Sequence, residues 1–225
     1  MLDTAHSLLD DDEESLSDVL TKLRHEVGLR QLLDTALRPG RLDAYWHDNG
    51  FAKVVLATGK KTGRKLVLHV WPTAAVVDTE DNIHNHRWDF ASAIIIGTLE
   101  MEIFTSDRAD ITLDHYSYSP VGGDGRYRFE RQGRMSVGRG AYFQLSAGKD
   151  YHLDNSVLHR AWGGRLGATA SVVVQSAPQR PVTTVLLRGD VPTAPSEQVN
   201  RLTEQKLMEI VDITTTPDAE SAWRR

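Results

Sequence analysis

The chain changes its hydrophobic pattern twice along its length. From Ser15 to about Gly40, apolar residues recur every three, four or five positions, which predicts a helix with one buried face. From Phe51 onward, short runs rich in Val, Ile, Tyr, Phe and Thr alternate with turn residues, a pattern typical of strands. A second helical pattern runs from Ser196 to Ile213. The sequence therefore predicts a β-rich core between two helical segments.

The expected helices have recognisable ends. Arg38-Pro39-Gly40 ends the first pattern, since proline disfavours helix in the residue before it and glycine permits a turn. Residues 1–14 finish in the acidic run Asp10–Glu14, which has nothing to bury, so we expect a loosely ordered leader there. The run Thr214–Pro217 stops the second helix, and the last residues are expected to fray.

The β segment holds a long succession of candidate strands. They are Phe51–Ala57, Lys65–Trp71, Ile83–Ile96, Leu99–Thr105, Thr112–Ser119, Arg126–Arg131, Ala141–Leu145, Tyr151–Leu153, His159–Trp162, Ala168–Ser176 and Val182–Arg188. Separators such as Gly59–Gly63 and Gly138–Gly140 carry the glycine chemistry of hairpin turns. Strands at this density, without helices between them, indicate an antiparallel sandwich or barrel. We divide the chain into an acidic flexible leader, a helical N-terminal segment, a barrel, and a C-terminal helix with a tail, at residues 1–14, 15–45, 46–190 and 191–225.

Composition narrows the class of protein. The 225 residues suffice for one substantial core. A net charge of −5 and an isoelectric point near 6.0, with only short basic clusters, argue against a nucleic-acid partner. No apolar run approaches the roughly 20 residues that span a bilayer, and the N-terminus is acidic where a signal peptide would be basic. We therefore expect a cytoplasmic protein without a membrane partner.

Candidate chemistry concentrates in Asn82–Phe90, where two histidines stand two residues apart directly before the apolar run Ala93–Ile96. Side chains at positions i and i+2 of an extended strand project to the same face, so His84 and His86 are expected to point together. The chain has no cysteine, so a metal must be held by His, Asp or Glu. A later residue, His159, follows a turn into a new strand and is the candidate third ligand.

Other residues near this stretch have competing interpretations. His152 is the chief rival to His159 as third ligand, although its place before a turn fits the pattern less well. Asp89 faces away by strict alternation, but a bulge would turn it inward as a carboxylate ligand or catalytic group; otherwise it partners an arginine or a turn amide. His69 is the other candidate catalytic residue, with a pocket wall, a donor to a ligand and a core histidine as its possible roles.

Two aromatic side chains flank the histidine pair. Trp88 and Phe90 share the expected strand face of His84 and His86, and they either line an apolar pocket or pack in the floor of a barrel. The remaining histidines are more often surface residues than ligands, and we expect that for His6, His25, His47 and His115.

These motifs resemble those of the cupins, a superfamily of small antiparallel β-barrels (double-stranded β-helices) with a metal in the mouth of the barrel. The matching features are His84-x-His86, the glycine Gly97 that closes the following strand, and the later His159. The resemblance covers about Phe51 to Pro178. It implies an all-β core, an antiparallel cupin β-barrel, with N-terminal and C-terminal helices.

The first cupin motif also has a glutamate a few residues after its second histidine, and this chain has Phe90 and Ala91 there. In that respect it is similar to the cupins that bind iron with three histidines, among them thiol dioxygenases such as cysteine dioxygenase. Leu66–Pro72 also resembles a flanking segment of that family. The late Ser-x-His-x-Tyr pattern of the family corresponds to Ser171–Gln175, where only the serine is retained. A cysteine substrate is therefore not expected, and we assign Gln175 and His152 to the substrate pocket.

The resemblance implies Fe(II) held by His84, His86 and His159, in a non-haem iron dioxygenase that oxidises a small organic substrate with O2. Three neutral imidazoles leave about three positions open on iron and contribute no negative charge. Zinc, nickel and manganese remain alternatives. So do two other functions: a metal-dependent isomerase, lyase or cyclase that uses the same ligands without redox chemistry, and a cupin that binds a small ligand without turnover. Edge strands leave a homodimer open as well.

Overall fold

The computed structural model describes residues 2–36, 43–47, 49–72, 82–121, 126–189 and 200–225. The described helices are α1 (Leu2–Leu9), α2 (Leu16–Glu26), α3 (Leu29–Ala36), α4 (Glu204–Thr214) and α5 (Pro217–Trp223). The described strands are β1 (Asp43–His47), β2 (Phe51–Thr58), β3 (Lys65–Trp71), β4 (Ile83–His84), β5 (Phe90–Ile96), β6 (Thr98–Thr105), β7 (Ile111–Val121), β8 (Arg126–Ser146), β9 (Asp150–Leu153), β10 (Leu158–Gly163), β11 (Thr169–Gln175), β12 (Thr183–Leu187) and β13 (Asn200–Arg201). None of these helices combines the length and the apolar character that crossing a bilayer requires. The predicted helix end at Arg38-Pro39-Gly40, the boundary at residues 190–191 and the helix start at Ser196 lie outside the described residues.

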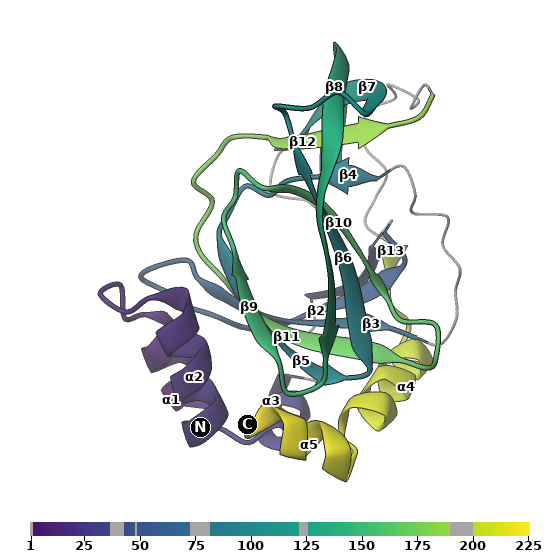
Figure 1. The fold of residues 1–225 in the computed structure, drawn as a ribbon. Helices are drawn as coiled ribbons and strands as arrows, with labels where there is room; N and C mark the ends of the chain where they lie inside the picture. Colours follow the sequence, from purple (N-terminus) through teal and green to yellow (C-terminus); the bar gives the residue numbers. More distant parts are fainter. Residues whose placement is uncertain (1, 37–42, 48, 73–81, 122–125, 190–199) are drawn as a thin grey trace.

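Antiparallel pairing organises the strands into two sheets. Seven strands form one sheet in the order β13-β1-β2-β3-β11-β5-β9, and the other six pair in a ring in the order β10-β4-β12-β7-β8-β6. Every pairing between described strands is antiparallel. Figure 1 shows the helices gathered on one side of the seven-stranded sheet. The prediction of an antiparallel β core with helices at both ends is confirmed.

The seven-stranded sheet is covered on both faces, and alternate residues of each strand serve different layers. In β3, Leu66, Leu68 and Val70 pack in the same cluster as the helices. Val67 and Trp71 lie on the opposite face, among residues of the second sheet. The inner face, between the two sheets, is therefore where side chains of both sheets can meet.

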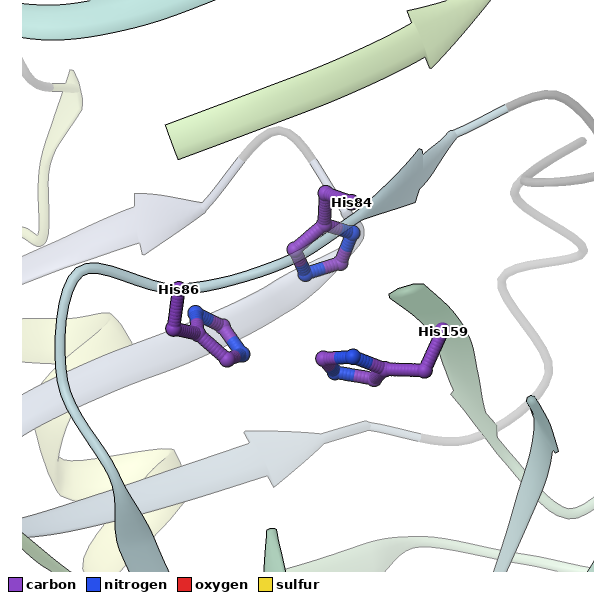
Figure 2. Close-up of side chains that lie close together, drawn as sticks. All are labelled: His84, His86 and His159. Atoms are coloured by element: carbon purple, nitrogen blue, oxygen red, sulfur yellow. The ribbon is translucent and has the colours of Figure 1, made fainter. Parts of the chain in front are cut away.

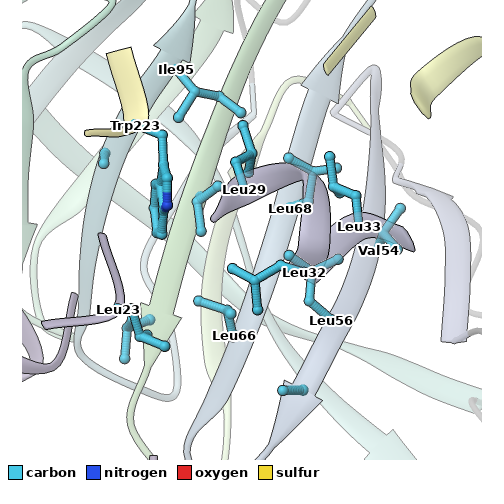
Figure 3. Close-up of a cluster of buried hydrophobic side chains, with 14 of the residues drawn as sticks. Leu23, Leu29, Leu32, Leu33, Val54, Leu56, Leu66, Leu68, Ile95 and Trp223 are labelled. Atoms are coloured by element: carbon cyan, nitrogen blue, oxygen red, sulfur yellow. The ribbon is translucent and has the colours of Figure 1, made fainter. Parts of the chain in front are cut away.

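The helical layer on the outer face is built from both ends of the chain. Leu23 and Leu32 from the N-terminal helices and Trp223 from α5 belong to one buried cluster against the sheet (Figure 3). Trp223 is fully buried, and its Nε1 donates to the carbonyl oxygen of Val27 at 2.9 Å. In return, Nε of Arg24 donates to the carbonyl oxygen of Trp223 at 2.7 Å. These bonds tie the two ends of the chain together.

The N-terminal leader is more ordered than its composition suggests. The prediction of a loosely ordered segment over residues 1–14 is wrong for Leu2–Leu9, which forms α1. Ala5 and Leu9 are fully buried in the helical layer, because their four-residue spacing gives this short helix one apolar face. Asp10, which begins the acidic run, accepts backbone hydrogen bonds from the β2–β3 turn, the shorter at 2.7 Å. The leader is thereby fixed to the sheet.

The C-terminal segment is also ordered to its end. Thr216 caps α5 with its side chain, and Pro217 occupies the first turn, where proline is well tolerated. The predicted stop after α4 is therefore also the start of a new helix, and the prediction of frayed final residues is wrong for Pro217–Trp223. The second helical pattern itself begins as a helix at Glu204.

β8 is a single long strand where the sequence predicts two. Its first part pairs with β7 and its last part with β6, so it bridges two neighbours in the ring. The predicted turn at Gly138–Gly140 is wrong, because these glycines serve close packing inside the strand. A Cβ at Gly138 would collide with Arg108, and one at Gly140 would approach the carbonyl oxygen of Ile103 to 3.0 Å.

The segment Ile83–Ile96 is likewise not one strand. It consists of β4 in the ring and β5 in the seven-stranded sheet, so the residues between them cross from one sheet to the other. Asn85 anchors this crossing: its N–H donates to the carbonyl oxygen of Thr184 at 3.1 Å, and its Oδ1 accepts from the N–H of Thr184 at 2.7 Å. Gly97, with φ of 67°, then turns the chain from β5 into β6.

Candidate metal centre

Three histidines from separate places in the chain converge between the sheets. His84 ends β4, His86 lies in the crossing segment, and His159 lies in β10. His159 and His84 are directly paired across the antiparallel β10–β4 contact, which places their side chains on the same face. Figure 2 shows the three rings directed toward a common point. His84 and His86 thus lie together, as the strand-face argument predicts, although His86 reaches this point from a crossing segment and not from a continuous strand.

The separations suit ligation of a single ion. The ring centroid of His84 lies 5.1 Å from that of His86 and 4.8 Å from that of His159. The centroids of His86 and His159 are 4.9 Å apart. One nitrogen from each ring lies within 4.8 Å of the others. Within the described part of the chain, this is the one group of three or more His, Asp or Glu side chains close enough to share a metal.

Backbone carbonyls orient two of the three rings. Nδ1 of His84 lies 3.2 Å from the carbonyl oxygen of Asn82, and Nδ1 of His159 lies 3.1 Å from that of Val157. A carbonyl oxygen can only accept a hydrogen bond, so each Nδ1 carries the proton and each Nε2 keeps its lone pair. That is the arrangement which metal-binding histidines usually show.

The three imidazoles are uncharged near neutral pH. Burial, and after it the neighbouring His84, lowers the pKa of His159 to about 3. Burial also lowers the pKa of His84, and it lowers that of His86 well below the ordinary value. Neutral imidazole is the form that binds metals, so the site does not have to release protons to accept an ion. Nitrogen ligands of this kind suit iron, zinc, nickel and copper.

Asp89 faces away from this group. Its Oδ1 accepts from the N–H of Asn155 at 2.7 Å, and its Oδ2 accepts from Nε2 of Gln179 at 2.9 Å. Both carboxylate oxygens are thus engaged in holding two loops beside the crossing segment. The bulge that would turn Asp89 inward is not formed, and the three-histidine group of the described residues contains no carboxylate.

The rival ligand His152 lies on the outer side of the sheet. It pairs across β9 and β5 with Ala91, which belongs to the helix-facing cluster. Its side chain is 43% exposed, and Nδ1 is 3.7 Å from Oδ1 of Asp154. A surface hollow of about 260 Å³ adjoins it, next to α2. The structure therefore separates His152 both from the metal candidates and from the other residues assigned to the substrate pocket, Trp88, Phe90 and Gln175.

The aromatic candidates do lie beside the histidines. The ring of Trp88 stacks on His86 with centroids 5.7 Å apart and planes 19° apart. Phe90 meets His86 edge-on at 5.2 Å and is 6.4 Å from His159. Gln175, which is 5% exposed, pairs with Phe90 across β11 and β5 and so shares its face.

His69 lies on the inner face of β3, next to Trp71 and Phe51. Its ring centroid is 4.6 Å from that of Phe51 and 6.0 Å from that of Trp71. Burial lowers its pKa well below the ordinary value. Its Nε2 is buried and has no hydrogen-bond partner in the described part of the chain. This makes it an inner wall residue with a free polar atom, outside the three-histidine group.

Two inner residues are missed by the sequence argument. His47, expected on the surface, stacks on Phe51 with centroids 4.5 Å apart, and burial lowers its pKa to about 3. Lys53 lies in the middle of β2 and is only 9% exposed; burial lowers its pKa to about 8. A lysine that alternates with Phe51 and Val55 in an otherwise apolar strand is the signal that could have identified Lys53. Of the other surface candidates, His25 is exposed, whereas His6 and His115 are half-buried.

Comparison with known proteins adds little to this geometry. No protein-family model and no curated protein matches the sequence. Similar solved structures include a chain from crystal structures of DMSP lyases, with 9% identity over 56% of this chain and 47% of that chain and a TM-score of 0.34. Hydroquinone 1,2-dioxygenase in complex with Cd2+ and 4-hydroxybenzonitrile has 14% identity over 62% of this chain and 64% of its own, with a TM-score of 0.31. Hydroxypropylphosphonic acid epoxidase from S. wedmorenis has 11% identity over 77% of this chain and 88% of its own, with a TM-score of 0.37.

The chain thus spans about half of the first of these proteins and less than two thirds of the second. All three TM-scores are below 0.5, so the likeness establishes neither a family nor an activity. The site's own geometry must support any functional assignment.

Proposed function

We propose that this protein is a metal-dependent enzyme with a cupin barrel, a non-haem Fe(II) dioxygenase that oxidises a small organic substrate with O2. His84, His86 and His159 are the metal ligands. The observation that carries the proposal is the convergence of three uncharged imidazoles, two of which are held by backbone carbonyls with Nε2 free. The antiparallel sheets that face each other around this point support the cupin assignment.

The residues present fit a divalent ion. Three neutral nitrogen ligands provide a facial set and no negative charge, which leaves coordination positions and net positive charge for substrate and O2. When bound there, iron would supply the binding and activation of O2. Because the group lacks a carboxylate among the described residues, an anionic substrate is attracted more strongly than at a site that contains one.

The surrounding side chains have distinct parts in this proposal. The carbonyl oxygens of Asn82 and Val157 keep the Nδ1 protons of His84 and His159 in place, which fixes the direction of each Nε2. The stacked ring of Trp88 restricts rotation of His86 and, because it is apolar, keeps water from that side of the site.

Metal analysis of anaerobically purified protein tests the first half of the proposal. The wild-type protein should bind about one Fe(II) per chain, and His25→Ala, a change on the exposed face of α2, should bind the same amount. Wild-type protein that takes up no divalent metal would show that the histidines are packing residues, as in a ligand-binding barrel.

Oxygen consumption tests the second half. An iron-loaded oxygenase should consume O2 when its substrate is present and should lose this activity when zinc replaces iron. Turnover of a substrate without O2 uptake, retained with zinc, would instead establish the isomerase, lyase or cyclase class on the same ligands.

A further inference from the structure

A row of polar side chains crosses the inner face of the seven-stranded sheet. Tyr45 pairs with Lys53 across β1 and β2, Lys53 pairs with His69 across β2 and β3, and His69 pairs with Ser171 across β3 and β11. Directly opposite residues of antiparallel strands share a face, so these four side chains stand side by side. The side chains that flank this row on the same inner face are apolar. Polar side chains in such an apolar surrounding are expected to have hydrogen-bond partners, from the protein or from a ligand.

Lys53 is the charged member of this row, and no carboxylate of the described residues forms an ion pair with it. The residue is 9% exposed, and no Asp or Glu of the described residues is within ion-pair distance of its Nζ. Its Nζ instead lies 5.2 Å from the ring centroid of Trp88 and 5.9 Å from that of Tyr45. Aromatic rings stabilise a cation only partly, and a buried charge without a counter-ion is costly. Asp43 acts on this charge only beyond ion-pair distance, so a bound anion would stabilise the buried cation further.

Two indole N–H groups on the same inner face also lack an acceptor. Nε1 of Trp88, Nε1 of Trp71 and Nε2 of His69 are buried, and none has a hydrogen-bond partner in the described part of the chain. An indole N–H can only donate. Among the described residues, both indole N–H groups thus lack the hydrogen-bond acceptor that buried donors ordinarily have.

Trp88 connects this donor group to the candidate metal centre. One ring contacts both sites, because Trp88 stacks on His86 at 5.7 Å while Lys53 lies over the same indole at 5.2 Å. Lys53 also contributes to lowering the pKa of His69, which places its charge within electrostatic reach of the inner wall. A single indole ring therefore separates Lys53 from His86.

We propose that Lys53, assisted by the indole N–H of Trp88, binds the carboxylate of a small carboxylic acid, and that this is the substrate class of the site. That the bound acid is a substrate rests on the proposed function. The anion site itself does not depend on a metal. A monoanion is favoured over a phosphate because a single ammonium group, among aromatic rings, balances one negative charge.

The test measures binding of propionate to metal-free protein through the indole N–H signals of the five tryptophans in 15N-labelled protein. Propionate should shift the Trp88 signal in the wild type, and propionamide, its neutral isostere, should not. Lys53→Met should bind propionate at least about tenfold more weakly. Lys149→Met, a change at an exposed lysine, should bind as the wild type does.

Three results would overturn the proposal: equal binding of propionate and propionamide, undiminished binding by Lys53→Met, or tighter binding of inorganic phosphate than of propionate. The first and third comparisons use the wild-type protein, so they decide the matter even if Lys53→Met does not fold. Measuring the zinc uptake of the same protein preparation separates the two hypotheses. Propionate binding through Lys53 in a protein that takes up no metal would leave the anion site standing while the oxygenase fails, and stoichiometric metal without selective propionate binding would do the reverse.

Discussion

His159 is the direct cross-strand partner of His84, and the centroids of their rings lie 4.8 Å apart. The contact is local to one residue pair, because β4 has only two residues and meets β10 at this position alone. A metal held by both rings would therefore reinforce a short junction in the ring of strands. Binding to the folded state alone stabilises it by mass action, so metal should raise the stability of this protein.

Replacing His159 with alanine should abolish stoichiometric metal binding, while the same change at His152 should not. His159 is 3% exposed and faces His84, whereas the His152 side chain is 43% exposed on the far side of the sheet. Loss of one of three ligands should weaken affinity by more than about a hundredfold, since even indirect partners of a ligand are worth 10–100-fold. Competition with a chromophoric chelator measures this, and tight binding by His159→Ala would disprove the assigned ligand set.

Asp89→Ala should leave metal content unchanged and lower stability. The carboxylate accepts two hydrogen bonds, from Asn155 at 2.7 Å and Gln179 at 2.9 Å, and loss of a charged acceptor costs about 1–3 kcal/mol. Urea unfolding and metal analysis of the same preparation provide the two readouts. A fall in bound metal at unchanged stability would mean that Asp89 turns inward and acts as a ligand.

The sequence predicts that His84 and His86 lie together on one continuous strand, whereas in the structure only His84 belongs to a strand. Alternation along a strand places i and i+2 together, and the apolar run after them indicates burial. The crossing between β4 and β5 depends instead on the bonds of Asn85 to Thr184, a residue about a hundred positions away. Such long-range pairing leaves no local pattern, so the break in the strand could not be predicted.

Trp223→Ala should destabilise the protein by about 3–5 kcal/mol, the usual cost of truncating a large buried aromatic side chain. Trp223 is fully buried, with 0% of its surface accessible to solvent, and it packs with α2, α3 and the outer face of the sheet. Met208→Ala on α4, where the side chain is 67% exposed, should change the free energy of unfolding by less than about 0.5 kcal/mol. Equal small effects of both changes would show that the C-terminal helix does not dock on the sheet.

His47 and Lys53 show where composition-based expectations fail. Both side chains are polar, and a surface position is the sound default for such residues. Lys53 is buried and His47 half-buried because β2 and β1 place them on the face that the second sheet covers, next to Phe51. Only the tertiary arrangement decides whether one face of a strand or both faces are covered. The sequence of β1 does not contain that information.

The stability of the metal-free protein should fall as pH drops below about 6.5, and His47 should account for part of this. Burial lowers its pKa from 6.5 to about 3, so between these values the unfolded chain binds a proton that the folded chain does not. Stability then rises with pH by at most about 1.4 kcal/mol per unit for this group. His47→Gln should show a correspondingly shallower dependence in urea unfolding between pH 4 and 6.5. An unchanged slope would mean that His47 titrates normally in the folded protein.

Lys53→Met should make the free protein more stable. Burial lowers the pKa of Lys53 from 10.5 to about 8, so below pH 8 folding has to bury a charge that the unfolded chain keeps in water. At about 1.4 kcal/mol per pKa unit, the charge costs about 3 kcal/mol, and methionine has a similar length without it. Because the unfolded lysine loses its proton only near pH 10.5, the advantage of methionine should be complete at pH 7 and should shrink between pH 8 and pH 10.5.

Thermal unfolding at pH 7 and pH 10 measures this, with Lys149→Met as the matched exposed control. If the control gains as much as Lys53→Met, the gain comes from the surface and not from burial. If Lys53→Met is instead less stable than the wild type, Lys53 has a partner that offsets its charge in the free protein. A variant that gains stability and loses propionate binding together would show that the chain keeps a costly buried cation for its ligand, as expected when a residue is retained for function against stability.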